Sequence, residues 1–324
     1  MVVHSALLIQ QLEYLVSLAR ERHFGRAAKA CNVSQPTLSV AIRRMEQELG
    51  VVVVLRGRRF EGFTDEGNRI VAWAHRILAE RDELLADVER MRGRLTATAR
   101  VGAIPTAIPA SPLLTRQFVV DNPDAAIRIE AMSSREIARR LADFEIDAGL
   151  TYLDDETPPG SRRIELYRER YVLLAPSTHS LMSQDHVRWV QVAELPLCAL
   201  TPAMRNRRII DAHIAAEGAR LYPVVEADTV GALYAHLTNS DLATVASHAW
   251  LHGFGVPPGL AIRHMVQHDL GPAVGLIVLD REPSSIVANA LVAAGAHADF
   301  SGTLQSALDA WLIRRNQSPT HQPH

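Results

Sequence analysis

Two groups of polar or basic side chains stand near the start of the chain. The first group consists of Ser34, Gln35, Pro36, Thr37, Ser39 and Arg43. The second is a short cluster of Arg56, Arg58 and Arg59. Short polar side chains form hydrogen bonds with base edges, and guanidinium groups pair with phosphate oxygens. These residue types therefore predict a nucleic-acid contact.

The distribution of charge supports this interpretation. The 324-residue chain has a formal net charge of −2, yet residues 20–60 contain nine basic and three acidic residues. A small basic segment joined to a larger acidic body is typical of a module that faces a polyanion. A solvated protein surface is the alternative, and the apolar residues beneath the charges decide between the two.

The sequence contains few features that are typical of a catalytic or metal-binding site. Among 14 histidines, His236, His248 and His252 come nearest to metal-ligand spacing, but no HExxH motif is present. There is also no GxGxxG after a strand, no P-loop and no GxSxG. The two cysteines, Cys31 and Cys198, have neither disulfide nor ligand spacing. We expect no metal, no cofactor and no enzymatic activity; the alternative is an enzyme or metabolite-binding α/β protein with a fused DNA-binding module.

Apolar periodicity predicts three short helices followed by a hairpin. The residues are Leu12, Leu15, Val16 and Ala19 for the first helix, 26–32 for the second, Leu38, Ile42, Met45 and Leu49 for the third, and 51–55 and 60–63 for the strands. Ser34 is suited to cap the third helix, Pro36 to lie in its first turn and Gly50 to end it. This is the helix-turn-helix arrangement, whose second helix enters the major groove while the hairpin acts as a wing. A plain three-helix bundle is the alternative.

Six sequence blocks in this region resemble those of the LysR-type transcriptional regulators. They are Leu12–Leu15, Phe24–Ala28, Val33–Ser39, Ile42–Glu46, Glu48–Gly50 and Phe63–Gly67. Two departures stand out. Val40 and Ala41 follow the Leu-Ser pair, where the family usually has a long polar residue, and this affects one or more expected DNA contacts. Val52 and Val54 replace the usual Pro and Phe of the first wing strand.

A long amphipathic helix is predicted next, capped by Thr64 and extending to about Gly93. Its heptad seam is interrupted by Arg81 and consists of Ile70, Ala74, Ile77, Leu84, Val88, Met91 and Leu95. A single helix cannot bury so narrow a seam, so we expect pairing with a second copy through Ile70, Ile77, Leu84, Val88 and Met91. Docking on its own C-terminal body is the alternative. The resemblance also implies a dimer, two of which commonly form a tetramer.

Strands and helices alternate in the rest of the chain. The expected strands are 100–104, 126–132, 147–152, 171–176, 196–200, 224–227, 242–245 and 274–279. Alternation of this kind favours a mostly parallel sheet with helices on its faces. Three blocks, Phe144–Asp147, Tyr171–Pro176 and His179–Leu181, resemble the LysR effector domain, which is similar in fold to periplasmic solute-binding proteins. The resemblance implies two lobes with a small molecule between them.

The expected ligand site lies at the carboxyl ends of strands, beside helix N-termini. The residues at these positions are Thr106, Ser133, Ser134, Thr201, Met204, Arg207 and Thr229. Hydroxyl and backbone N–H groups together with a guanidinium favour a small carboxylate or oxyanion. For Ser133, a plain helix cap is the alternative. The segment Leu200–Asp211 also resembles that of regulators that accompany formate metabolism, so formate is the first compound to test.

The sequence as a whole predicts an α/β protein. Its expected parts are an all-α winged helix-turn-helix (1–64), a long linker helix (65–95), a two-lobed α/β effector domain like the periplasmic binding proteins (96–315) and a disordered tail (316–324). The expected partners are double-stranded promoter DNA, a small effector and further copies of the chain. The resemblance implies that the effector changes lobe closure, DNA bend and contact with RNA polymerase. No secretory signal or membrane-length apolar stretch is seen, so we expect a cytoplasmic protein.

Overall fold

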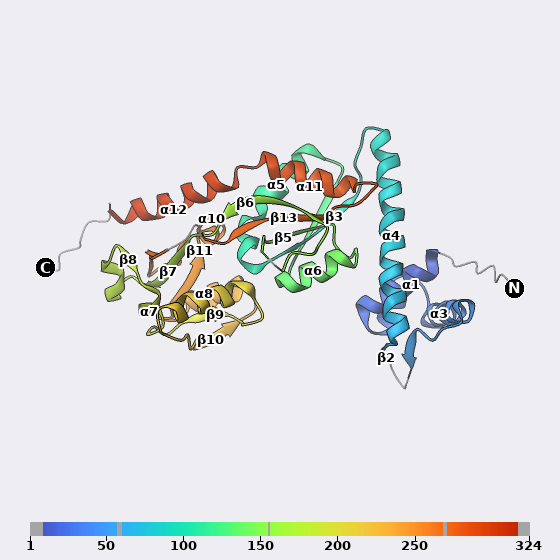
Figure 1. Cartoon of the computed structure of the whole chain (residues 1–324), viewed down its shortest axis with the longest axis horizontal. Coiled ribbons are helices and arrows are strands. Elements are labelled where there is room, and N and C mark those ends of the chain that lie inside the picture. Colours follow the sequence, from blue (N-terminus) through green and yellow to red (C-terminus); the bar gives the residue numbers. More distant parts are fainter. Residues whose placement is uncertain (1–8, 57–59, 155, 268–270, 317–324) are drawn as a thin grey trace. The chain divides into compact units, whose positions relative to one another are not determined.

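The structure is a computed structural model that describes residues 9–56, 60–154, 156–267 and 271–316. Contacts divide the chain into two compact units (Figure 1). The N-terminal unit extends to Gly93 and includes residues 143–145, and the C-terminal unit contains the rest. Most of the long helix therefore clusters with the N-terminal unit. The predicted disordered tail lies outside the described residues except for Asn316.

The described part of the N-terminal unit consists of helices and one hairpin. Its elements are α1 (Ile9–Glu21), α2 (Phe24–Ala30), α3 (Gln35–Leu49), β1 (Val54–Arg56), β2 (Phe60–Phe63) and α4 (Asp65–Met91). Ser34 caps α3 by accepting a hydrogen bond from the Thr37 N–H at 3.2 Å, and Gly50 ends it in the left-handed conformation at φ 69°. The helix-turn-helix, the helix cap at Ser34 and the helix end at Gly50 are thus as predicted.

Two details of this unit differ from the sequence prediction. Leu49 is 37% exposed, so the buried stripe of α3 ends at Met45. The first strand begins at Val54 because the N–H groups of Val53 and Val54 donate to Glu46 Oε1, at 2.9 and 3.0 Å. The Glu46 carboxylate of α3 therefore binds the backbone of residues 53–54, which were expected to lie within the strand 51–55.

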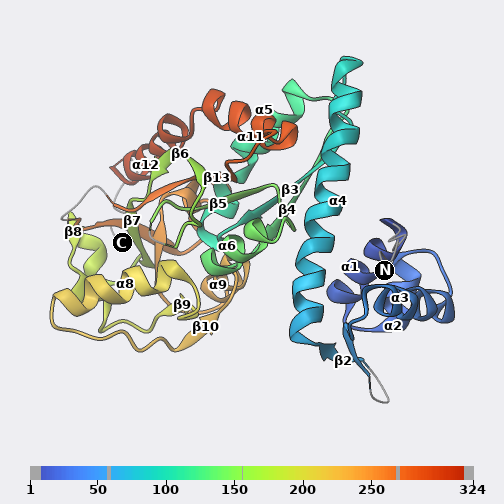
Figure 2. The same ribbon diagram turned by 45° about the vertical axis from the view of Figure 1, so that its right-hand side comes forward.

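The long helix α4 packs along α1 by its N-terminal half (Figure 2). Ala74 is buried in the unit's core, and Ile70 and Ile77 pack against that core. Arg81, predicted to interrupt the seam, forms ion pairs with Glu13 of α1 and with Asp82. Of the later seam members, Leu84, Val88 and Met91 are exposed, whereas Leu95 is buried.

Lobe 1 of the C-terminal unit is built on a five-stranded sheet in the order β4-β3-β5-β13-β6. The strands are β3 (Thr98–Ala103), β4 (Ala126–Ala131), β5 (Ala148–Tyr152), β6 (Ser161–Arg168) and β13 (Ala273–Leu279). Helices α5 (Ser111–Asp121) and α11 (Ile286–His297) cover one face and α6 (Ser134–Ala142) the other (Figure 1). A short turn of 3-10 helix, η1 (Pro105–Ala110), follows β3.

Lobe 2 contains a four-stranded sheet in the order β11-β7-β12-β8 and a parallel pair, β9 and β10. Its strands are β7 (Tyr171–Pro176), β8 (His186–Val187), β9 (Cys198–Leu200), β10 (Val225–Ala227), β11 (Thr244–Ser247) and β12 (Leu260–Met265). Its helices are η2 (Ser180–Ser183), α7 (Trp189–Val192), α8 (Arg205–Ala216), α9 (Val230–Thr238) and α10 (Ala249–Gly253), and α12 (Phe300–Asn316) packs against α10 and β6. The chain crosses between the lobes from β6 to β7 and from β12 to β13.

The expectation of a mostly parallel sheet is wrong for much of this unit. Strands β4, β3 and β5 are parallel, whereas β13 and β6 are antiparallel and β7 pairs antiparallel with both β11 and β12. Three strands were also missed: β6, β8 and β12. β8 has only two residues, β6 is half-exposed at a sheet edge and β12 contains Arg263 and His264, so none of them shows the apolar run that predicted the others. None of the helices in the described part of the chain has the length and hydropathy needed to cross a membrane.

Candidate nucleic-acid interface and ligand cavity

The first candidate site is the outer face of α3. Gln35, Pro36, Thr37 and Arg43 are all exposed, while Leu38, Ile42 and Met45 on the opposite face are completely buried. The core of the unit therefore fixes which side of the helix can meet a partner.

The other residues predicted to contact nucleic acid are placed differently. Ser34 uses its hydroxyl oxygen to cap the helix and lies 2.8 Å from Thr37 Oγ1. Ser39 is half-buried. Arg58, Arg59 and the side chain of Arg56 lie outside the described residues.

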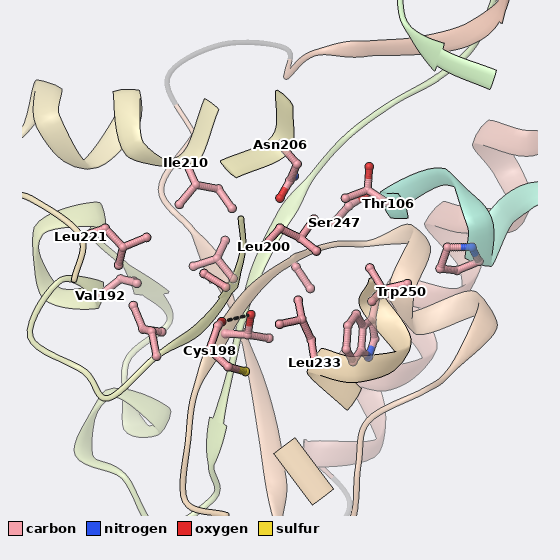
Figure 3. Close-up of a pocket in the computed structure, with 17 residues that line it drawn as sticks. Thr106, Val192, Cys198, Leu200, Asn206, Ile210, Leu221, Leu233, Ser247 and Trp250 are labelled. Carbon is pink, nitrogen blue, oxygen red and sulfur yellow. Dashed lines mark hydrogen bonds between the residues drawn. The ribbon is translucent and has the colours of Figure 1, made fainter. Parts of the chain in front are cut away.

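The second candidate site is a pair of adjoining cavities in the C-terminal unit. The large cavity has about 540 Å³ of space, including open solvent at its mouth, and the small cavity has about 190 Å³. Both are lined by Thr106 and Leu200 and by Asn206 from the first turn of α8. Figure 3 shows Thr106 and Asn206 at the upper edge of the large cavity, above Cys198 and Leu233.

Apolar side chains dominate the walls of the large cavity. They include Val192, Ile210, Leu221, Leu233 and Trp250, and none of the described residues that line this cavity is charged. The polar groups on its wall come from Thr106, Asn206, Cys198, Thr244 and Ser247. A site of this volume and composition is typical of a pocket for a small organic molecule.

A hydrogen-bond network connects the lobes at the back of the small cavity. The hydroxyls of Tyr152 and Tyr171 both donate to Glu169 Oε2 at 2.9 Å, and Asn206 Nδ2 donates to Tyr152 Oη at 3.4 Å. Thr106 Oγ1 lies 3.3 Å from the same phenolic oxygen. Complete burial raises the pKa of the Glu169 carboxyl, although the tyrosine hydrogen bonds act in the opposite direction.

One buried oxygen of the small cavity, Ser134 Oγ, lacks a hydrogen-bond partner among the described residues. Buried polar atoms are rarely left unpaired, because desolvation without a hydrogen bond costs about 1–3 kcal/mol. Ser134 therefore offers a contact for a bound polar group.

Arg207, which was expected to attract an anion, and its neighbours Arg205 and Arg208 all have protein partners. Arg205 Nε lies 2.8 Å from Asp154 Oδ2, and Arg208 pairs with Glu156 at 2.6 Å, so α8 of lobe 2 is bound to the end of lobe 1 strand β5. The buried Arg207 pairs with Glu226 at 2.6 Å and with Asp211 at 2.9 Å. These carboxylates neutralise the guanidinium groups locally.

The structure brings together four of the seven residues predicted to bind an effector. Thr106, Ser133, Ser134 and Met204 line the small cavity. Ser133 also accepts a hydrogen bond from the Glu136 N–H at 3.2 Å, so it caps α6 as well. The other three line neither cavity: Arg207 is bound to its acidic partners, Thr229 caps α9, and the Thr201 N–H donates to the Ala227 carbonyl.

Sequence reasoning missed Tyr152 and Asn206. Tyr152 is the last residue of β5, so the rule that ligands bind at the carboxyl ends of strands identifies its position. Asn206 lines both cavities from the first turn of α8.

His248 and Cys198 are both buried in the C-terminal unit. The described residues contain no group of three side chains suited to hold a metal. Buried His248 accepts a hydrogen bond from the Arg170 N–H at Nδ1, and burial together with the charge of Arg170 lowers its pKa to about 4. Burial raises the pKa of the Cys198 thiol to about 11.

Two parts of the chain match known protein families. Residues 9–68 match the bacterial regulatory helix-turn-helix proteins of the lysR family, and residues 92–298 match the LysR substrate binding domain. The chain belongs to the LysR family. This LysR protein is 32% identical over 191 residues to the hydrogen peroxide-inducible genes activator of Haemophilus influenzae, covering 58% of the chain and 60% of that protein. It is 29% identical over 181 residues to XapR of Escherichia coli, covering 54% and 60%.

The aligned part thus spans about 60% of the length of these curated relatives. Their names describe regulators of genes and none describes an enzyme, in agreement with the sequence prediction. None refers to formate, so the formate-associated resemblance is not confirmed.

Solved structures show the same LysR fold. A full-length OxyR variant from Pseudomonas aeruginosa matches with a TM-score of 0.72 and 24% identity, over 93% of this chain and 98% of that one. Full-length CbnR in complex with its target DNA matches with a TM-score of 0.64 and 20% identity, over 90% and 99%. The predicted combination of a winged helix-turn-helix with a two-lobed α/β domain is confirmed.

Proposed function

We propose that this LysR protein is a cytoplasmic, homo-oligomeric transcriptional regulator that binds promoter DNA through α3 and is controlled by a small molecule held between its lobes. The exposed polar face of α3, fixed by the buried opposite face, carries the proposal. The CbnR structure supports it, because that related fold was solved with its target DNA. Effector-dependent lobe closure would then change the spacing of paired DNA-binding units, the DNA bend and contact with RNA polymerase.

Replacement of Gln35 by alanine tests the DNA-binding face. An amide that reads a base contributes about 1–3 kcal/mol of discrimination, so we expect about a tenfold loss of affinity for a specific duplex and little loss for random DNA. The specific duplex is obtained by selection from a random-sequence library, and affinities are measured by fluorescence anisotropy. Gln47→Ala is the matched control, since Gln47 is also exposed but lies near the end of α3. Equal losses on both DNAs would contradict the assignment of Gln35.

Pairing of two copies is proposed through the later part of α4. Leu84, Leu85, Val88 and Met91 are exposed there, and Trp73 is exposed further toward the N-terminus of the helix. Ile70 and Ile77, which we predicted for this contact, instead pack against the core of their own unit. The proposed contact is therefore shorter than the sequence suggested.

The proposed effector is an uncharged molecule with an apolar body and a polar end. The large cavity offers apolar walls, while Thr106, Asn206 and Ser134 offer hydroxyl and amide groups beside it. The small anion suggested by the sequence finds weaker support, because Arg205, which lines the small cavity, is already paired with Asp154.

Matched neutral and anionic compounds test this chemistry. We expect benzyl alcohol and benzamide to raise the midpoint of thermal unfolding saturably, and benzoate, formate and acetate to have no such effect. Stabilisation at one hundred times the dissociation constant is about 2.7 kcal/mol. Ala199→Phe should abolish the shift by filling the large cavity, whereas Ala235→Phe, on the exposed side of α9, should keep it. A shift with the anions alone would contradict the proposed chemistry.

Peroxide sensing through Cys198 is not expected, although some relatives are named for hydrogen peroxide. The thiolate is the reactive form of cysteine, and a pKa of about 11 leaves on the order of 10⁻⁴ of the thiol ionised at pH 7. The other cysteine, Cys31, belongs to the N-terminal unit. We expect equimolar hydrogen peroxide to leave Cys198 reduced, as measured by thiol labelling and mass spectrometry of the folded protein. The protein unfolded in urea serves as the reactive control, and rapid oxidation in the folded state would contradict the prediction.

A further inference from the structure

Val40 is an apolar residue at the centre of the exposed face of α3. Its side chain is 62% exposed. The residues one turn before and after it on the same face, Thr37, Arg43 and Arg44, are polar and exposed. Leu38, Ile42 and Met45 on the other side of the helix pack into the core, so Val40 is not part of the buried stripe.

Helix stability does not account for a valine at this position. Branching at Cβ restricts the side chain, so valine is a poorer helix former than arginine, glutamine or lysine. Val40 also lies in the N-terminal half of α3, which is the part of a recognition helix that reaches base edges.

The chemistry of the major groove indicates what such a side chain can contact. Among the four bases, only thymine presents a methyl group there, beside its hydrogen-bonding atoms. Contact between two apolar groups removes both from water, which stabilises the complex by about 0.8 kcal/mol for each methyl group buried.

We propose that Val40 reads a thymine in each half-site by contact between its γ-methyl groups and the thymine 5-methyl group. The inference rests on the proposed function, because it requires α3 to enter the major groove. It also gives a role to the departure from the LysR pattern at this position. Polar neighbours then position the helix, and Val40 selects a base without a hydrogen bond.

Uracil substitution isolates the single methyl group. A duplex selected from a random library by the full-length protein is resynthesised with uracil in place of one thymine at a time, in one or both half-sites. We expect one position at which wild-type affinity falls about fourfold for one half-site and about sixteenfold for both, the factor that corresponds to ~0.8 kcal/mol per methyl group.

Serine and threonine variants provide the matched pair, since they differ by one γ-methyl group. Val40→Ser should bind the thymine and uracil duplexes equally, and Val40→Thr should recover most of the preference for thymine. Val52→Ser is the control, because Val52 is 65% exposed but lies outside α3. Unchanged circular dichroism melting of each variant establishes that folding is intact.

The outcomes separate the inference from the proposed function. If selection recovers no preferred duplex, DNA reading by α3 itself fails. If a preferred duplex is recovered but no thymine-to-uracil change weakens wild-type binding, or Val40→Ser keeps the same preference as wild type, then Val40 does not read thymine.

Discussion

Gly67→Ala is expected to lower the free energy of unfolding of the N-terminal unit by about 3 kcal/mol. Gly67 lies in the first turn of α4, where its N–H donates to Thr64 Oγ1 at 2.8 Å. A β-carbon at this position would overlap the carbonyl oxygen of Val53. Val53 cannot move away easily, because it is completely buried and its N–H is bound to Glu46. Urea denaturation of the full chain, followed by circular dichroism, measures the change.

Gly231→Ala is the control for Gly67→Ala. Gly231 lies in α9, where an added β-carbon meets open space, and alanine stabilises a helix by roughly 0.5–1 kcal/mol relative to glycine. The two identical substitutions should therefore have effects of opposite sign. A Gly67→Ala variant as stable as wild type would show that α4 and Val53 do not approach closely in solution.

Glu169→Leu is expected to destabilise the C-terminal unit by about 3 kcal/mol. The substitution removes the carboxylate oxygen that accepts hydrogen bonds from Tyr152 and Tyr171. Tyr152 keeps Asn206 and Thr106 within hydrogen-bond distance, but the buried Tyr171 hydroxyl is left unpaired, which costs about 1–3 kcal/mol. Tyr171→Phe removes this hydroxyl, so the double variant should recover about 1 kcal/mol relative to Glu169→Leu. Denaturation of the full chain measures both, and equal stabilities of single and double variants would contradict this account.

The same glutamate also makes stability depend on pH. Burial raises the pKa of Glu169 in the folded protein above its value in the unfolded chain. Its contribution is therefore fully present below the unfolded pKa and is lost as the pH rises through the folded pKa, by about 1.4 kcal/mol per pH unit. Glu169→Gln keeps an acceptor for the two tyrosines but does not titrate. The stability of wild type relative to this variant should fall as the pH rises, and a constant difference would contradict the raised pKa.

The N-terminal unit could be predicted closely because its signals are local. Ser34, Gly50 and Thr64 act within one helical turn of their own positions in the sequence. The errors arose where a distant side chain intervened. Glu46 takes the N–H groups that were assigned to the first strand, and Glu13 engages Arg81 of the predicted seam. Periodicity shows which face of a helix is apolar, but it does not show which partner covers it.

The C-terminal unit was predicted less well because its site forms between lobes that are distant in sequence. Thr106 and Ser134 were found from strand ends in lobe 1, where each strand is followed directly by a helix start. Arg207 was predicted to contact an effector, but composition does not show that the carboxylates of Asp211 and Glu226 pair with it. Tyr152, Glu169 and Tyr171 meet only when the chain crosses from one lobe to the other.

The length of α4 has a geometric consequence for reading DNA. Its 27 residues extend about 40 Å, and the first half is held in the same core as α1 and α3. If α4 turned by about 5° about its exposed C-terminal end, its N-terminal end would therefore move by about 3.5 Å, which is close to the rise of one base pair. In the proposed dimer, a small change in the angle between the paired helices would thus displace one α3 relative to the other by about the rise of one base pair.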